Sequence, residues 1–250
     1  MDRDTEIYRY LSFKRFHQML FQKQIALVLP EKWDDEYEVF WLKSLHSEEG
    51  QQRCAEYLKQ FGEDQQKIKD QIDCLSRVNL NHTYCLCFSQ CRDEEVLWRA
   101  NSDNKKGIMI TTTCGNMEDL IRDSADSSPY IAKIQYDLVP SKTFDSFLKQ
   151  FIVLSDNTVV NWDPFNFLLH KRSSFSYEKE VRVMCHYYKE NSDGILPCRI
   201  PDLSSFICEV MAHPLAEDDY AEKIRSLCEH FKIHFAGRSK VYRFERLQED

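Results

Sequence analysis

Two glutamates stand two residues apart in the segment 175–182, which reads Phe-Ser-Tyr-Glu-Lys-Glu-Val-Arg. Side chains alternate between the two faces of an extended strand, so we expect Glu178, Glu180 and Arg182 on one face, opposite two valines. Carboxylates this close repel each other, so one of them is held partly protonated or directed at a positive centre. Such a pair suits chemistry at a sugar carbon, because the transition state there resembles an oxocarbenium ion. A solvent-facing strand edge is the alternative.

An arginine and a serine earlier in the chain are candidate ligand contacts. Arg9 stands between Tyr8 and Tyr10 on an expected strand, where an inward guanidinium would form a fork on a phosphate or carboxylate. Ser89 ends the apolar run 83–89, which predicts a hydroxyl at the margin of a sheet. The alternatives are a surface arginine and a serine that caps the following turn.

A third group, His82 with Cys85, Cys87 and Cys91, resembles a metal site only superficially. Its spacing, H-x2-C-x-C-x3-C, matches no common zinc site and lacks paired C-x-x-C knuckles, so we expect no metal. The chain has ten cysteines in irregular spacing behind an N-terminus without an apolar signal. This pattern favours reduced, buried thiols in a bacterial cytoplasm, or in a host cytosol if the protein is an exported effector.

Composition excludes several classes of protein. With 42% hydrophobic and 30% charged residues in a chain of 250, the sequence is globular. A net charge of −8 gives no broad electrostatic surface for nucleic acid, although a local basic groove stays possible. None of the 6 glycines falls in a G-x-G-x-x-G or G-x-x-x-x-G-K-[ST] pattern, which argues against Rossmann and P-loop nucleotide sites. No apolar run is long enough for a membrane span, and we expect no membrane partner.

Strand-like and helical patterns alternate along the chain, which predicts one mixed α+β domain over 1–250. Strands are expected at 7–11, 25–29, 83–89, 107–113, 181–187 and 205–212. Helices are expected at 14–21, 47–77, 94–100 and from Glu217 onward.

Together these segments resemble a bacterial family catalogued as domain of unknown function 2971, and the likeness spans nearly the whole chain. Its helical stretch at about 47–79 resembles a variable insertion. The motifs that carry the resemblance are Tyr8 to Ser12, Ala26 to Glu38 with the box Trp33-Asp34-Asp35-Glu36-Tyr37-Glu38, Cys87-Phe88-Ser89 followed by Leu97-Trp98 and Gly107, and Phe175 to Arg182.

The order of Arg9, Ser89 and Glu178-x-Glu180 is also similar to the Arg–Ser–Glu layout of toxin-type ADP-ribosyltransferases. That resemblance implies a split, strongly curved β core that clamps NAD without a Rossmann fingerprint. It implies that Arg9 holds the NAD pyrophosphate or the adjoining ribose, and that Ser89 orders the nicotinamide ribose. Tyr10 or Phe175 would stack on the nicotinamide, with core packing as the alternative.

The same resemblance implies a mono-ADP-ribosyltransferase with NAD as its substrate. Glu180 would accept a bond from the ribose 2′-OH and stabilise the positive charge that develops as nicotinamide departs. Glu178 would orient or deprotonate the acceptor. A glutamate at this position implies arginine as the acceptor, so a protein is favoured over nucleic acid. The implied setting is a bacterial toxin, effector or phage-defence factor; the oligomeric state is open. Alternatives are an NAD glycohydrolase, and a silent binding module of a defence or toxin–antitoxin system.

Two conditions follow from this hypothesis. Arg9, Ser89 and Glu180 must converge on one cleft, with side chains within about 10 Å, to bridge a dinucleotide. A Glu180→Gln protein is expected to lose activity at a nearly unchanged melting temperature.

Overall fold

The computed structural model describes residues 1–250 apart from 103, 126, 138–153, 156–157, 160–164, 166–167, 190, 192 and 243–250. In the described part of the chain, nine strands form one sheet in the order β11-β10-β4-β1-β3-β2-β9, and β8 and β5 extend it from β3. These strands are β1 (Glu6–Ser12), β2 (Gln24–Val28), β3 (Thr83–Ser89), β4 (Gly107–Thr113), β5 (Tyr130–Lys133), β8 (Glu180–His186), β9 (Ile195–Arg199), β10 (Glu209–Ala212) and β11 (Phe235–Arg238). β10 and β11 are parallel whereas β1, β4, β3 and β8 pair antiparallel, so the sheet is mixed.

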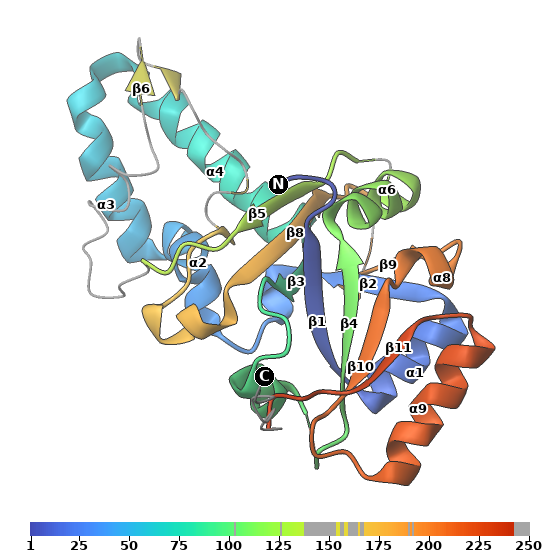
Figure 1. Ribbon diagram of the computed structural model, residues 1–250. Helices are drawn as coiled ribbons and strands as arrows, with labels where there is room; N and C mark the ends of the chain where they lie inside the picture. The colour runs from blue at the N-terminus through green and yellow to red at the C-terminus, as the bar shows by residue number, and fades with distance from the viewer. Residues whose placement is uncertain are drawn as a thin grey trace.

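Helices and short 3-10 turns surround this open, curved sheet (Figure 1). The α-helices are α1 (Phe13–Gln22), α2 (Phe40–His46), α3 (Glu48–Leu58), α4 (Gln65–His82), α5 (Glu95–Asn101), α6 (Cys114–Ala125), α8 (Leu203–Phe206) and α9 (Asp218–His230). The 3-10 helices are η1 (Pro30–Lys32), η2 (Glu36–Val39), η3 (Lys59–Asp64) and η5 (Ser173–Glu178). Two short strands, β6 (Leu154–Ser155) and β7 (Thr158–Val159), pair separately.

The sheet divides at β3, and the position of the site follows from this division. β3 pairs with β8 along its whole length. On its other edge, β1 pairs with it at Tyr8↔Ser89 and β2 pairs with it at Val28↔Cys85. Within the described chain, no strand pairs with β3 between these two points on that edge. We call this gap between β1 and β2 the fork. The α+β class and the split core expected from the sequence are therefore confirmed.

Alternation along β1 separates two apolar layers. Ile7 and Leu11 belong to a core that α1, α6 and α9 cover on one face of the sheet. Tyr8 and Tyr10 point to the opposite face, where they pack with Trp98 and other side chains of a smaller cluster. Arg9 is two residues from Ile7 and from Leu11, so its side chain lies on their face of the sheet, at the fork.

The helical stretch predicted at 47–77 is confirmed as α3, η3 and α4. With α2 these helices form an arm to one side of the sheet, around a second core that contains Leu42, Leu58, Ile68 and Ile72 (Figure 1). This core reaches the sheet through Cys85 on β3 and Met184 on β8, so the arm is fixed to the strands that flank the fork. Farther along the chain, the strand expected at 205–212 is wrong in its first half, because Leu203–Phe206 is helical and β10 begins at Glu209.

The segment with the two glutamates differs from the expected single strand. Glu178 is the last residue of η5, Lys179 has a left-handed backbone with φ 40°, and β8 begins at Glu180. The predicted alternation holds from there on: Val181 and Val183 are in the main core while Glu180 and Arg182 share the other face. The prediction that Glu178 shares this strand is therefore wrong, because the turn at Lys179 interrupts it.

Ser89 fastens this turn to the fork. Its hydroxyl donates to the carbonyl of Glu178 (2.6 Å) and accepts from the backbone N–H of Cys91 (2.9 Å). Its backbone pairs with Tyr8 on one side and Glu180 on the other. The side chain therefore connects β1, β3 and the start of β8.

We expect Ser89→Ala to lower the free energy of unfolding by about 1–3 kcal/mol, because it leaves a buried donor and acceptor without partners. Urea unfolding followed by circular dichroism measures the change. Ser205→Ala is the control: that hydroxyl makes one exposed 3.3 Å bond to a carbonyl, and its loss should stay within about 0.5 kcal/mol. Equal, small effects in both variants would show that Ser89 does not fasten the fork.

Candidate active site

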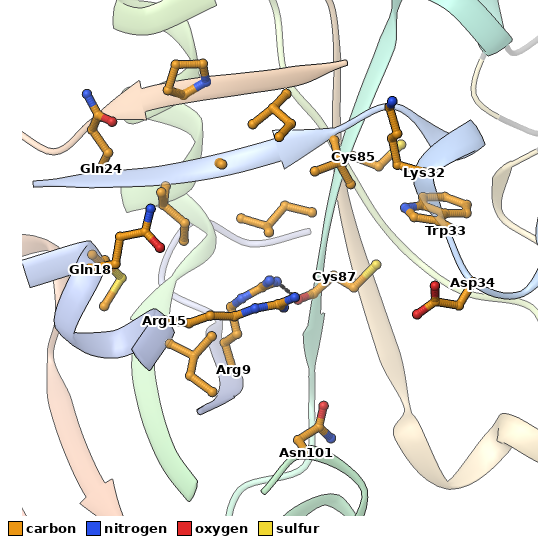
Figure 2. A pocket seen from close by; sticks show the side chains of 18 of the residues that line it. Arg9, Arg15, Gln18, Gln24, Lys32, Trp33, Asp34, Cys85, Cys87 and Asn101 are labelled. Atoms are coloured by element: carbon orange, nitrogen blue, oxygen red, sulfur yellow. Dashed lines mark hydrogen bonds between the residues drawn. The ribbon is translucent and has the colours of Figure 1, made fainter. Parts of the chain in front are cut away.

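A cavity of about 820 Å³ opens at the fork between β1, α1, β2, β3 and the η1–η2 segment. Its wall includes Arg9, Arg15, Lys32, Trp33, Glu38 and Cys87. Figure 2 shows the side chains of Arg9 and Arg15 directed toward Cys87 on β3. The cavity combines guanidinium groups on the side of β1 and α1 with acidic groups on the side of η2.

Arg9 compensates for the missing strand at the fork. Its Nη1 donates to the carbonyl of Cys87 (2.5 Å), on the edge of β3 that β1 leaves unpaired. Burial is the main cause that lowers the pKa of Arg9, to about 10, and the positive charge of nearby Arg15 lowers it further. The guanidinium is still protonated at pH 7. Among the described residues, neither Arg9 nor Arg15 has a carboxylate within ion-pair distance, so both charges are available to an anion in the cavity.

Beside the cavity lies a set of five ionisable side chains that we call the charge cluster: Glu38, Lys171, Glu178, Glu180 and Arg182. Lys171 Nζ is 3.1 Å from Glu38, 2.7 Å from Glu178 and 3.1 Å from Glu180. Arg182 Nη2 is 2.5 Å from Glu38 and 2.7 Å from Glu180. Glu38 and Glu180 therefore each contact both cations. When all five groups are ionised, three carboxylates and two cations leave one negative charge in excess.

Protonation in the charge cluster is governed by its ion pairs. Burial by itself would raise the pKa of Glu180, but Arg182 and Lys171 outweigh burial and lower that pKa to about 2. Burial would likewise lower the pKa of Lys171, and Glu180 and Glu38 reverse this and raise it. The pKa of Glu178 is raised, mainly by burial, against the opposing effect of Lys171. Glu180 is thus a permanent anion at neutral pH.

The strands that carry the expected triad of Arg9, Ser89 and Glu180 are neighbours, but the three side chains do not line one cleft. Arg9 adjoins Tyr8, which pairs with Ser89, which in turn pairs with Glu180. Of the triad, Arg9 alone is among the described residues that line the cavity. Ser89 and Glu180 are 5% and 3% exposed and lie behind the wall. The catalytic roles assigned to these residues stay predictions.

The two aromatic candidates occupy different surroundings. Tyr10 lies on the face of β1 opposite Arg9, where its hydroxyl donates to the carbonyl of Cys91 and its ring meets Trp98 edge-on. It therefore belongs to the core, the alternative reading of this residue. The ring of Phe175 has Lys171 Nζ 4.8 Å from its centroid, so it flanks the charge cluster. Neither ring is among the described residues that line the cavity.

Sequence reasoning missed Glu38, Lys171 and Trp33. Arg182 lies 4.3 Å from the centroid of the Trp33 ring and fixes that ring at the cavity wall. Trp33 and Glu38 open and close the acidic box in the 26–38 segment, so the motif that contains them was visible. Their pairing with Lys171 and Arg182, more than 130 positions later, was not.

The expected absence of metal stays a prediction. Cys85 is packed in the core of the helical arm, and both Cys85 and Cys87 line the cavity. In the portion of the chain that the structure describes, no group of three or more His, Cys, Asp or Glu side chains could hold a metal ion. No helix of that portion is both long and apolar enough to cross a membrane.

Comparisons with known proteins gave structural neighbours only. No family model matches the chain, so its membership of domain of unknown function 2971 stays a prediction, and no curated protein matches it. Two solved structures of DarT from Thermus sp. 2.9 are similar, each with a TM-score of 0.37 and 9% identity over 94% of this chain. They are covered to 95% and 96% of their own length. One is a complex with NAD⁺ and the other a complex with ADP-ribosylated single-stranded DNA.

One expectation is corrected at this point. The sequence favours a protein over a nucleic acid as acceptor, because the resemblance implies arginine as the acceptor and the acidic net charge gives no broad surface for nucleic acid. The DarT complex with ADP-ribosylated single-stranded DNA overturns that preference. Net charge describes the whole surface, whereas a cavity with Arg9, Arg15 and Lys32 in its wall is locally basic on one side.

The charge cluster changes what a Glu180→Gln protein should do. Gln in place of Glu180 removes one of the two carboxylates on Arg182, which is fully buried, and leaves Glu38 as its remaining ion-pair partner. We therefore expect the free energy of unfolding to fall by about 1.5–3 kcal/mol, the usual contribution of a hydrogen bond to a charged group, instead of staying unchanged. Urea unfolding at pH 7 measures it. The exposed pair partner Glu222, changed to Gln, is the control and should cost less than about 1 kcal/mol.

The pH dependence supplies an independent check. Because the pKa of folded Glu180 is below its ordinary value of 4.5, its carboxylate stabilises the fold above pH 4.5, and this stabilisation disappears as the pH falls from about 4.5 toward 2. The difference in unfolding free energy between wild type and Glu180→Gln should shrink over that interval. A difference that is constant from pH 7 to pH 3 would contradict the assigned pKa.

Proposed function

We propose that this protein binds NAD in the cavity at the fork and transfers its ADP-ribose to an acceptor. Two features of one cavity carry the proposal. Two arginines in its wall have no carboxylate partner among the residues that the structure describes, and the same wall leads to an anionic charge cluster. A diphosphate needs the first feature and a sugar that becomes cationic needs the second.

The guanidinium side of the cavity suits the diphosphate of NAD. A guanidinium has five N–H donors, and Arg9 donates one of them to the carbonyl of Cys87, so others remain for a ligand. Arg15 adds a second guanidinium and Lys32 an ammonium on the same wall. Two adjacent positive charges repel, and a doubly charged diphosphate between them relieves that repulsion.

The remainder of the cavity suits the two nucleosides. Its volume of about 820 Å³ lies in the range of sites for ligands of this size. Trp33 presents an aromatic ring at the wall, held in place by Arg182, and such a ring can stack on a nicotinamide or adenine. The proposal thus keeps Arg9 as a pyrophosphate ligand and assigns to Trp33 the stacking that was expected of Tyr10 or Phe175.

The charge cluster supplies the electrostatics of the reaction. When the bond between ribose C1 and the nicotinamide nitrogen breaks, positive charge develops on the ribose. Three carboxylates against two cations create a fixed negative potential beside it, at no cost in reorganisation during the reaction. Glu180 keeps its charge at neutral pH because Arg182 and Lys171 lower its pKa. Glu178, which is less buried, remains the proposed contact of the acceptor.

Assays of nicotinamide release and of acceptor labelling identify the acceptor. Single-stranded DNA comes first, because one of the similar DarT structures holds this modified nucleic acid. Release of nicotinamide without a labelled acceptor would identify an NAD glycohydrolase that uses the same residues. Binding of NAD without release of nicotinamide would identify a silent binding module.

Arg15→Gln tests the diphosphate contact. Arg15 is exposed, so the variant should fold normally, but loss of a charge-assisted bond of about 1.5–3 kcal/mol should raise the KM or Kd for NAD by about 10–100-fold. Nicotinamide release and calorimetric titration with NAD measure the effect. Arg225→Gln, an exposed arginine on α9 that does not line the cavity, is the matched control and should leave the affinity unchanged. An unchanged affinity in Arg15→Gln would remove this side of the cavity from the proposed site.

A further inference from the structure

Within the charge cluster, access to the cavity distinguishes the carboxylates. Of the five described residues of the cluster, Glu38 is the one that lines the cavity. The side chain of Glu38 is 11% exposed, whereas that of Glu180 is 3% exposed. Glu180 is therefore behind the wall, and Glu38 is at its surface.

The two carboxylates contact the same two cations, and Glu180 also accepts a bond from Arg182 Nε (2.8 Å). Glu38 places one oxygen on Lys171 (3.1 Å) and the other on Arg182 (2.5 Å). Glu180 does the same, with one oxygen on Lys171 (3.1 Å) and the other on Arg182 (2.7 Å). Both carboxylates thus lie beside the same two positive charges, and of this pair Glu38 alone lines the cavity.

We infer that Glu38 is a catalytic residue of the proposed reaction, in the place that the sequence pattern gives to Glu180. A carboxylate has about four lone-pair positions, and the two cations use two of them. The others can accept a hydroxyl of the nicotinamide ribose and stabilise its developing charge. Glu180 is then a positioning residue, which keeps Lys171 and Arg182 where they hold Glu38. The inference rests on the proposed function.

The step is a simple displacement. The bond from ribose C1 to the nicotinamide nitrogen breaks, and its electron pair leaves with neutral nicotinamide. A lone pair of the acceptor forms the new bond to C1, and the proton of the acceptor passes to water. Glu38 stays an anion throughout and forms no bond to the sugar.

The segment that carries Glu38 is fixed at both ends. Asp35 caps η2 by accepting from the N–H of Tyr37 (3.0 Å), and its carboxylate also pairs with Arg172 (2.9 Å). Val39, at the other end of η2, is buried in the core of the helical arm. Glu38 is thus preorganised, because its backbone is held independently of its own ion pairs.

Glu38→Gln tests the inference through nicotinamide release and NAD binding. We expect kcat to fall by about 10²–10³-fold, the usual loss when one stabilising group is removed, while the Kd for NAD changes by less than about threefold. Glu36→Gln is the matched control, since Glu36 is on the same 3-10 helix, is exposed and does not line the cavity. Its kcat should equal that of wild type.

Glu38→Asp covers the case in which Glu38→Gln fails to fold. It keeps the charge for Lys171 and Arg182 but withdraws the carboxylate by one methylene, so it should fold and still lose at least tenfold in kcat. If wild type is active and a folded Glu38→Gln or Glu38→Asp protein keeps the full kcat, the catalytic role of Glu38 is overturned while the proposed function stands. Wild type that releases no nicotinamide would overturn the proposed function, and the inference with it.

Discussion

Four charges that neutralise each other in the interior hold this structure together around its site. Glu38 and Glu180 each bridge Lys171 and Arg182, so the set links η2, the segment before η5 and the start of β8. Charges removed from water are unfavourable unless their partners are complete. Loss of Glu38 or Glu180 leaves each cation with one partner fewer, and loss of Lys171 or Arg182 leaves buried carboxylates that repel each other, so the wall of the cavity depends on all four.

The fork is the second constraint, and it follows from how little of β1 pairs with β3. A single register position, Tyr8↔Ser89, joins them, whereas β1 pairs with β4 along its whole length. The carbonyl of Cys87 would lack a donor there, and the side chain of Arg9 replaces the missing strand. The same guanidinium therefore satisfies the backbone and faces the cavity, which ties the structural role of Arg9 to its proposed role with NAD.

Local patterns predicted what depends on neighbours in sequence. β3 and β4 have the predicted bounds because short apolar runs end at polar or turn-forming residues, and the alternation of Glu180 with Val181 followed from strand geometry. The position of Glu178 outside the strand was not predicted, because Lys179 adopts a left-handed backbone and the sequence gives no glycine to indicate one there. β9 was not expected either, since it pairs with β2 across more than 160 positions.

The composition of the charge cluster lay beyond the sequence for the same reason. Glu38 and Arg182 are 144 residues apart, and nothing within either segment specifies the other. The acidic box and the segment 175–182 were each visible as motifs, but their contact is a property of the folded chain. The strands that carry Arg9, Ser89 and Glu180 are neighbours in the sheet, but the three side chains do not line one cleft as expected, and their order could not show which carboxylate meets the cavity.

A crystal structure of the protein with NAD, or with an analogue whose glycosidic bond does not break, tests the central claim most directly. We expect the diphosphate within hydrogen-bond distance of Arg9 and Arg15 at the fork, and a hydroxyl of the nicotinamide ribose on Glu38. A dinucleotide bound elsewhere on the surface, or a fork that stays empty at millimolar NAD, would contradict this account.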